Sequence, residues 1–248
     1  MKRDLYFSKP LMNAAGTLGF SPDSRASAPF DSFGAFVTNP ISLRPRLPAA
    51  QPRFISFSGG FLLHAGLPNA GLSAVIQKHS ARWKRAELPI IVHLMADRPE
   101  ETQQMVRSLE NAENVMAVEL GFAPFLSDDI LLTNLQMCIG EIPLIFALHA
   151  EQIFSLGAKL MERGAAALSM ANPRGALRAE GNLVSGRLYG RALFPRSMEI
   201  VHAASRIGLP LIGAGGAWSE QDAEDMLAAG ALAVQMDAGL WLPRREEK

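Results

Sequence analysis

Short apolar runs and helical patterns alternate along the whole chain, and this alternation limits the fold more than any single motif. Eight runs have the length of a buried strand: Pro10 to Ala15, Gly34 to Thr38, Leu88 to Met95, Val115 to Leu120, Ile142 to Leu148, Ala165 to Met170, Leu209 to Ile212 and Ala231 to Met236. Six stretches have helical periodicity: Leu72 to Trp83, Glu100 to Leu109, Asp128 to Ile139, Glu151 to Arg163, Ser197 to Ile207 and Ser219 to Ala228. Continuous apolar runs are typical of parallel strands that are buried on both faces. The pattern predicts an α/β fold, a (β/α)8 TIM barrel, with an open doubly wound sheet as the alternative.

Length and composition predict one domain over residues 1–248. The hydrophobic fraction is 48%, and 24 acidic residues balance 24 basic ones. Such a chain can bury a large core and has no overall charge that would attract nucleic acid. The single cysteine, Cys138, excludes an internal disulfide and is expected to be a buried, unreactive thiol. No apolar run is long enough to cross a membrane, and the first residues lack the apolar core of a signal peptide, so a cytoplasmic location is expected.

The segment from Leu209 to Met236 predicts a strand, a glycine turn, a helix from Ser219 and a second strand. Gly213, Gly215 and Gly216 fall at the carboxyl end of the first strand, where backbone N–H groups can bind a phosphate. The last βα units of an eight-fold barrel commonly hold a cofactor phosphate. The alternative is that these glycines only form a tight corner.

Two longer segments interrupt the alternation and are expected to form loops at the mouth of the barrel. They run from Ile41 to Leu67 and from Asn172 to Pro195. The second contains four arginines that either hold an anionic ligand over the mouth or are simply solvated: Arg174, Arg178, Arg187 and Arg191.

Several motifs resemble, in the same order, those of the class 1 dihydroorotate dehydrogenases. They are Asn13-Ala-Ala-Gly-Thr-Leu-Gly-Phe, Phe36-Val-Thr-Asn-Pro, Gly66-Leu-Pro-Asn-Ala-Gly, Gly186-Arg-Leu-Tyr-Gly-Arg-Ala-Leu-Phe-Pro and Gly213-Ala-Gly-Gly. The resemblance implies an FMN-containing barrel that oxidises dihydroorotate in pyrimidine synthesis, in some cases with an electron-transfer partner subunit. By the same resemblance, Asn69 would bind substrate, and the positions at the cofactor are Ala14, Ala15, Gly16, Asn39, Asn172, Gly190, Gly213, Gly215, Gly216 and Asp237.

The sequence departs from this family at the positions of its chemistry. Asn39 and Ala147 stand where the family has lysines, and His64 stands where it has a substrate-binding asparagine. The segment that carries the family's catalytic base reads Gly121-Phe-Ala-Pro-Phe, so the base would fall near Pro124. Without a proton acceptor there, dihydroorotate oxidation is expected to be lost or altered.

Asp237 is a further departure, because it would place a carboxylate beside the phosphate of FMN. The resemblance therefore predicts a divergent FMN oxidoreductase barrel, and it leaves open whether FMN is bound at all.

Two further interpretations remain open. One places the chemistry on other residues, and the other assigns no catalysis to the chain. Side chains two apart on a strand share a face, so if Gly121 and Ala147 face the barrel axis, Glu119 and His149 do too. His93 interrupts its strand in the same way, and His64 lies nearby in sequence. These four residues are candidates for a flavin-free acid–base site or a metal site, or for a hydrogen-bonded polar core. The last alternative is a non-catalytic pseudoenzyme subunit.

The segment from Trp241 to Lys248 is too short and too proline-broken for the helix that normally covers the eighth strand. A second subunit is expected to cover this region, either in a homodimer or in a hetero-complex. The apolar residues Leu240, Trp241 and Leu242 are the expected contact.

Overall fold

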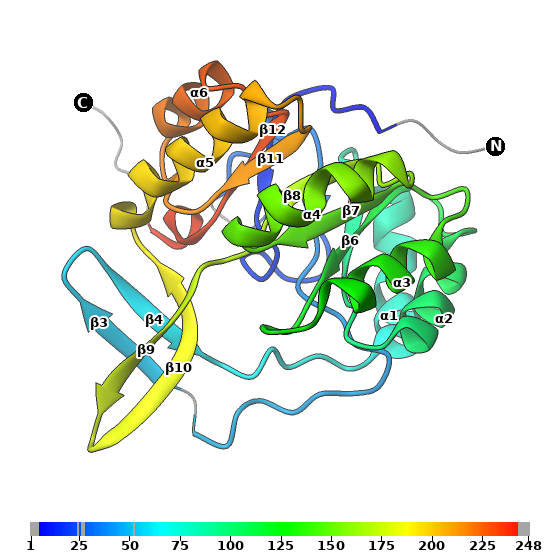
Figure 1. Cartoon of the computed structure of the whole chain (residues 1–248). Helices are drawn as coiled ribbons and strands as arrows, with labels where there is room; N and C mark the ends of the chain where they lie inside the picture. Colours follow the sequence, from blue (N-terminus) through cyan, green and yellow to red (C-terminus); the bar gives the residue numbers. More distant parts are fainter. Residues whose placement is uncertain (1–4, 24, 26–27, 52, 243–248) are drawn as a thin grey trace.

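The computed structural model describes residues 5–23, 25, 28–51 and 53–242, and the predictions made for the first and last few residues lie outside them. Eight parallel strands form a barrel, which confirms the predicted fold (Figure 1). In sheet order they are β1 (Leu11–Asn13), β12 (Ala233–Met236), β11 (Leu211–Ala214), β8 (Ala167–Met170), β7 (Leu144–Leu148), β6 (Val115–Gly121), β5 (Ile90–Met95) and β2 (Phe36–Val37). Each lies within a predicted run or extends beyond it by one or two residues.

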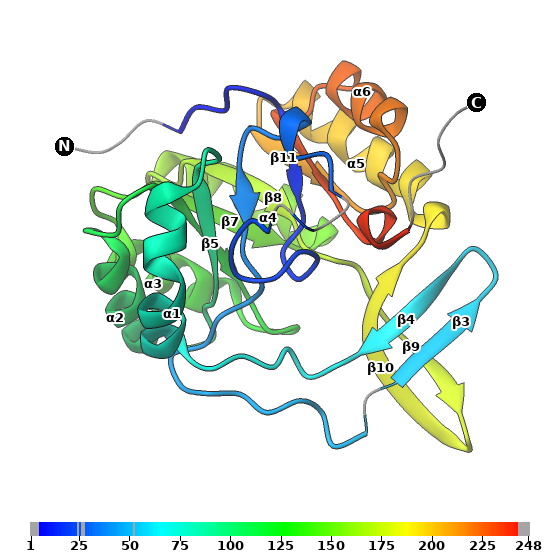
Figure 2. The same cartoon turned by 180° about the vertical axis from the view of Figure 1, so that it is seen from behind.

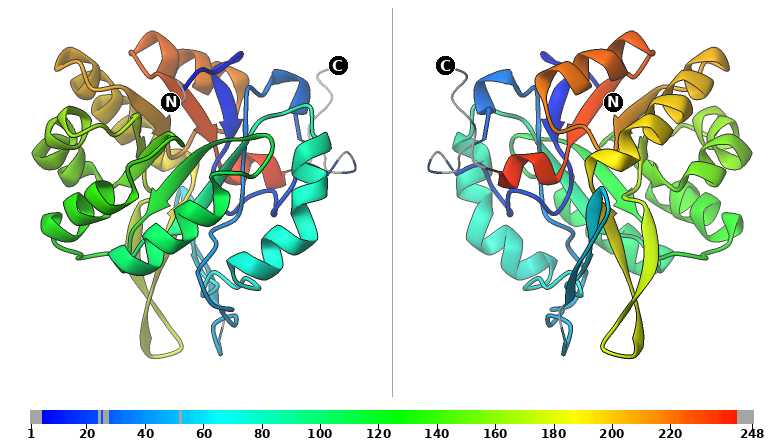
Figure 3. Two further views of the ribbon diagram at one scale, coloured as in Figure 1. Left: turned by 90° about the vertical axis from the view of Figure 1, so that its right-hand side faces the viewer. Right: turned by 90° about the vertical axis from the view of Figure 1, so that its left-hand side faces the viewer.

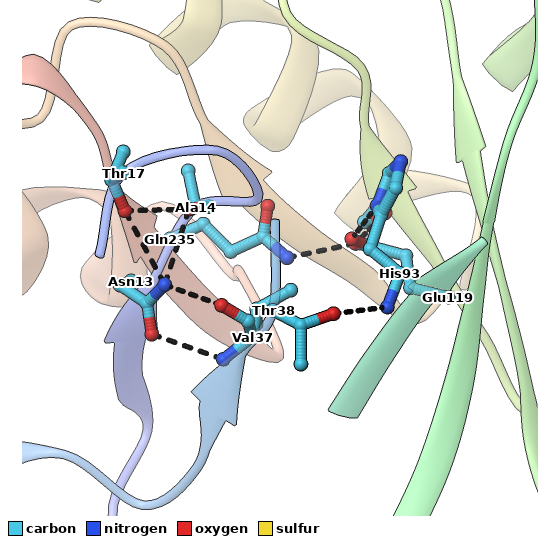
Figure 4. Close-up of polar contacts among 9 residues, drawn as sticks. Asn13, Ala14, Thr17, Val37, Thr38, His93, Glu119 and Gln235 are labelled. Carbon is cyan, nitrogen blue, oxygen red and sulfur yellow. Dashed lines mark hydrogen bonds and ion pairs between the residues drawn. The ribbon is translucent and has the colours of Figure 1, made fainter. Parts of the chain in front are cut away.

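The seam between β1 and β2 is closed by short backbone pairing and by one side chain. The backbone pairing comprises a bridge between Met12 and Ala35 and a hydrogen bond from the Gly34 amide to the Leu11 carbonyl at 2.8 Å. Asn13 adds two bonds, because its Nδ2 donates to the carbonyl of Val37 at 2.7 Å and its Oδ1 accepts from the amide of Val37 at 3.0 Å (Figure 4). The amide side chain thus imitates the backbone of a neighbouring strand, and the barrel closes without a full ladder.

Six α-helices are present in the described residues, and they lie outside the barrel strands (Figure 2). They are α1 (Leu72–Arg85), α2 (Pro99–Leu109), α3 (Asp128–Cys138), α4 (Ala150–Glu162), α5 (Phe194–Arg206) and α6 (Glu220–Ala228). All six were predicted. Helix α5 begins earlier than expected, because Pro195 lies in its first turn, where a backbone N–H has no partner within the helix and a proline is tolerated. Within the described part of the chain, short 3-10 helices follow β1 (η1, Phe30–Ser32) and β12 (η3, Ala238–Trp241), and a third (η2, Arg191–Leu193) precedes α5.

The interior of the barrel is divided into an apolar layer and a polar layer. The apolar layer is built from small and branched side chains that include Met12, Ile91, Ala117, Ile145 and Ile212, all fully buried. Filling of the barrel by layers of side chains is usual for this fold. A larger apolar core lies between the strands and the helices, and it includes Cys138, whose burial raises the pKa of its thiol to about 12. The expectation of a buried cysteine is confirmed.

The two long segments were expected to form loops at the mouth of the barrel. Residues of both do reach the mouth, but parts of both form strands. They pair as two hairpins in one antiparallel sheet of order β3 (Arg53–Phe57), β4 (Gly60–His64), β10 (Asn182–Tyr189) and β9 (Arg174–Ala179). Glu180 and Gly181 both have positive φ, 50° and 80°, which suits the two-residue turn between β9 and β10. This sheet projects from the barrel (Figure 3).

None of the described helices is both long and apolar enough to cross a bilayer.

Candidate functional site

A cavity of about 190 Å³ lies at the carboxyl ends of the barrel strands. Its wall combines His93, Glu119, His149 and Gln235 from the barrel with Arg46, Arg174 and Arg187 from the two long segments. An apolar groove of about 560 Å³ between the start of α4 and α5 shares His149 and Arg174 with it. Active sites of this fold lie at this end, so the cavity is the candidate site.

Glu119 is the centre of a buried hydrogen-bond network in the polar layer of the barrel. Its Oε2 lies 2.6 Å from His93 Nδ1, and its Oε1 accepts from Ser169 Oγ at 2.6 Å and from Gln235 Nε2 at 2.8 Å (Figure 4). The four residues come from strands β5, β6, β8 and β12, so the network spans the barrel. Only 1% of Glu119 is exposed.

Strand register explains why His93 and Glu119 meet. The two residues are direct partners in the parallel pairing of β5 with β6, and both alternate with apolar residues of the layer below. The imidazole packs over Gly121, where an added Cβ would lie only 2.3 Å from His93 Nε2. Glycine at this position therefore makes room for the ring. The predicted inward orientation of His93 and Glu119 is confirmed.

The hydrogen bonds keep Glu119 ionised. Burial alone would raise the pKa of its carboxyl, but the hydrogen bond and charge of His93, with the bonds from Ser169 and Gln235, outweigh burial and lower the pKa. An ionised carboxylate only accepts, so His93 Nδ1 is the donor and Nε2 is the nitrogen beside Gly121 at the cavity wall.

Arg174 and Arg187 face each other on adjoining strands of the projecting sheet. They are direct cross-strand partners in the pairing of β9 with β10, and both line the cavity. The pKa of Arg174 is lowered by burial and by the charge of Arg187. Among the residues that the structure describes, no carboxylate lies within 4.0 Å of either guanidinium. Two like charges therefore meet at the cavity without an acidic partner.

The other two arginines of this segment lie away from the cavity wall. Arg191 lies 3.5 Å from Asp222 at the start of α6, and Arg178 lies further along β9.

The two remaining histidine candidates have different positions. His149 lines the cavity directly after β7, and burial together with the charge of Arg174 lowers the pKa of its imidazole. His64, at the end of β4, lines a neighbouring hollow of about 290 Å³ instead. Within the described residues, no group of three or more His, Cys, Asp or Glu side chains is arranged to hold a metal ion.

The glycine turn after β11 is filled by Asp237 rather than left open. Asp237 Oδ2 accepts from the amide of Gly216 at 3.2 Å, and the carboxyl is 1% exposed. Burial raises the pKa of Asp237 to about 6, although the amides of Gly216, Ala238 and Gly239 and the Trp218 indole act in the opposite direction. A Cβ on Gly216 would lie 2.5 Å from the backbone nitrogen of Phe194, and one on Gly215 would lie 2.8 Å from Ser197 Oγ.

Of the other positions that the resemblance assigned to ligands, four lie at the mouth. Ala15 and Asn172 line the cavity, and Gly16 and Asn39 line the neighbouring hollow.

Four more of the positions that the resemblance assigned to ligands pack against other residues or stabilise loops. Asn69 lies outside both hollows, where its Oδ1 accepts from the amides of Ser42 and Gly71. Ala14 is buried, Gly190 packs against the hairpin at Gly59, and Gly213 packs against Met226 of α6.

Sequence reasoning missed several residues of the cavity. Ser169 and Gln235 interrupt apolar strand runs as His93 does, so the same signal would have found them. Asp97 and Arg46 also line the wall, and Asp97 Oδ1 accepts from the amide of Ala123. They lie outside the strands, where no periodicity singles them out.

Comparisons with known sequences point to the dihydroorotate dehydrogenases. The family model described as dihydroorotate dehydrogenase matches residues 3–122. The chain is 29% identical to the catalytic subunit of dihydroorotate dehydrogenase B (NAD(+)) from Pelobacter propionicus over 94% of this chain and 84% of that one. It is 27% identical to the corresponding subunit from Geotalea uraniireducens, with the same coverage. The chain is thus similar over most of its length to dihydroorotate dehydrogenases, the family that its sequence motifs resemble.

Solved structures of similar fold include dihydroorotate dehydrogenase from Eimeria tenella in complex with ferulenol. The TM-score is 0.71 with 20% sequence identity, over 94% of this chain and 76% of that one. This similarity supports the barrel fold.

Proposed function

We propose that this chain binds a small organic anion at the barrel mouth without a flavin, and that it does not oxidise dihydroorotate. The observation that carries the proposal is the cross-strand pair of Arg174 and Arg187 at the cavity wall. Like charges directly opposite each other destabilise a sheet. A bound carboxylate would neutralise both guanidinium groups and accept hydrogen bonds from them.

The residues at the cofactor positions do not fit FMN as the resemblance implies. The Gly216 amide already donates to Asp237, and Phe194 closes the other side of the turn. No cation replaces the lysine that the family carries at position 147, which is alanine. The proposed function therefore rests on side chains of this chain alone.

His93 is the group proposed to exchange a proton with the anion. Glu119 binds its Nδ1 and fixes the orientation of the ring, which leaves Nε2 at the cavity wall. A histidine oriented by a carboxylate is a common general acid or base. The segment Ala123-Pro124-Phe125 offers no side chain that accepts a proton, which supports loss of dihydroorotate oxidation.

Cavity volume limits the part of the ligand that reaches His93. A space of about 190 Å³ is small beside ligand pockets, which are commonly about 300 to 1,000 Å³. The anionic end is therefore small, such as a single carboxylate with a few neighbouring atoms. The adjoining groove, which is lined largely by apolar residues, can accept an apolar extension.

The test compares Arg174→Met with Arg178→Met, because both arginines lie on β9 and only Arg174 lines the cavity. Calorimetric titration with a panel of small carboxylates should find a ligand whose affinity falls at least about 10-fold in Arg174→Met and stays unchanged in Arg178→Met. The absorption spectrum of the purified protein should lack flavin bands. Stoichiometric flavin, orotate formation at ordinary enzyme rates, or equal effects of the two variants would contradict the proposal.

We also propose that the chain assembles as a homodimer or in a hetero-complex. Trp241 and Leu242 are 41% and 52% exposed, although Trp241 also donates to the carbonyl of Thr17 and packs against Phe61 and Tyr189. Sedimentation at several protein concentrations tests this assembly, and a persistent monomer without a co-purifying partner would count against it.

A further inference from the structure

The turn between β11 and α6 has the form of an anion-binding site. Gly215 and Gly216 have positive φ, 95° and 82°, which carries the backbone from the strand toward the start of the helix. Asp237 follows the neighbouring strand β12, so its side chain reaches the same carboxyl edge of the barrel. In barrels of this type a phosphate commonly binds at this edge, on backbone amides beside a helix start.

The chain's own carboxylates occupy the backbone donors of this turn. Asp237 Oδ2 accepts from the Gly216 amide. Asp222 Oδ2 accepts from the amides of Trp218 and Ser219 at 2.9 Å each, as part of the capping box that begins α6. The two carboxylates thus take positions that phosphate oxygens would take on an open turn.

Asp237 is an imperfect occupant. Among the residues that the structure describes, its buried Oδ1 and Trp218 Nε1 have no partner within hydrogen-bond geometry, although the Trp218 indole and the amides of Ala238 and Gly239 are close enough to lower the pKa of the carboxyl. A buried carboxylate oxygen without a donor is costly. The turn therefore offers more hydrogen-bonding capacity to an anion than the side chain of Asp237 uses.

We infer that Asp237 is an internal occupant of an ancestral phosphate-binding turn, and that removal of its side chain opens a site for a phosphate monoester. The far side of the turn is closed, because Gly216 packs against the backbone of Phe194. The volume of the Asp237 side chain is therefore the obstacle, in addition to its charge. This inference is independent of the proposed anion site at His93.

The experiment separates occupancy from charge repulsion with two substitutions. Asp237→Gly removes both the charge and the volume, whereas Asp237→Asn removes only the charge. Inorganic phosphate is titrated by calorimetry, and FMN is compared with riboflavin by fluorescence. Asp237→Gly should bind phosphate at least about 10-fold more tightly than the unmodified protein and should prefer FMN to riboflavin. Asp237→Asn should bind phosphate as weakly as the unmodified protein.

Asp225→Asn is the matched control, since it removes one exposed charge from α6 without contacting the turn. It should leave phosphate binding unchanged. Equal gains in phosphate affinity in Asp237→Asn and Asp237→Gly would overturn the inference that the side chain occupies the site, because charge repulsion alone would then explain the weak binding. A folded Asp237→Gly variant that does not bind phosphate would overturn the inference altogether. If that variant does not fold, Asp237→Ala, which also removes the carboxylate, decides the question by the same comparison.

Discussion

Glu119 and Asp237 are both carboxylates with 1% exposure at the same end of the barrel, yet their environments act in opposite directions. Glu119 accepts three side-chain hydrogen bonds, and its pKa is lowered. Asp237 accepts one bond of good geometry, from Gly216; the weaker interactions with Ala238, Gly239 and Trp218 do not offset burial, which raises its pKa to about 6. Burial alone therefore does not decide the charge of a carboxyl group in this protein; the number and quality of its donors do.

Removal of Glu119 should have the largest effect on stability. Glu119→Ala leaves His93, Ser169 and Gln235 buried without their acceptor, and the loss of one partner from such a network costs on the order of 3 to 5 kcal/mol. Urea denaturation at neutral pH measures the loss. Glu119→Gln is the milder control, because one amide oxygen can still accept hydrogen bonds. A loss below about 1 kcal/mol would show that the network is dispensable.

Asp237 should make the protein less stable as the pH rises. Its pKa is about 6 in the folded protein against 3.8 for an unperturbed aspartate, so the folded state binds the proton more tightly. Its stabilising contribution is complete below pH 3.8 and is lost as the pH rises through 6, by on the order of 3 kcal/mol. Glu119 acts in the opposite direction, because its lowered pKa adds stability above 4.5 that is lost in acid.

Asp237→Asn tests this prediction, since the variant should lack the loss between pH 4 and 7 and be the more stable protein at neutral pH. Denaturation midpoints across this pH range provide the measurement. An identical pH profile in the two proteins would contradict it.

The smallest expected effect comes from removing one donor to Glu119. Ser169→Ala should cost about 1 kcal/mol and should move the pKa of Glu119 upward, toward the value of an unassisted buried acid. Titration of the Glu119 carboxyl by NMR gives the direction of the shift. Ser108→Ala, on the exposed face of α2, is the control and should leave that titration unchanged.

The barrel could be predicted from the sequence because burial on both faces leaves a strong signal in each strand. His93 and Glu119 were predictable for the same reason, since a polar residue in an apolar run must face something that satisfies it. The four-stranded sheet was not predicted, because its two hairpins lie more than 100 residues apart where they pair, as in Leu63 with Arg187, and one edge of each hairpin is exposed. The position of Asp237 was predicted, but only the structure shows that its carboxylate binds the turn.

The pairing of β1 with β12 has a consequence for synthesis of the chain. Leu11 pairs with Val234 and Asn13 with Met236, so the first strand finds its main neighbour only when nearly the whole chain exists. During synthesis on the ribosome, one edge of β1 would stay unpaired. Its other edge would be held by Asn13 and the short backbone pairing with β2. Such long-range pairing slows folding and exposes strand edges to aggregation. Production of this protein should therefore be sensitive to the rate of translation and to chaperones that shield an unfinished barrel.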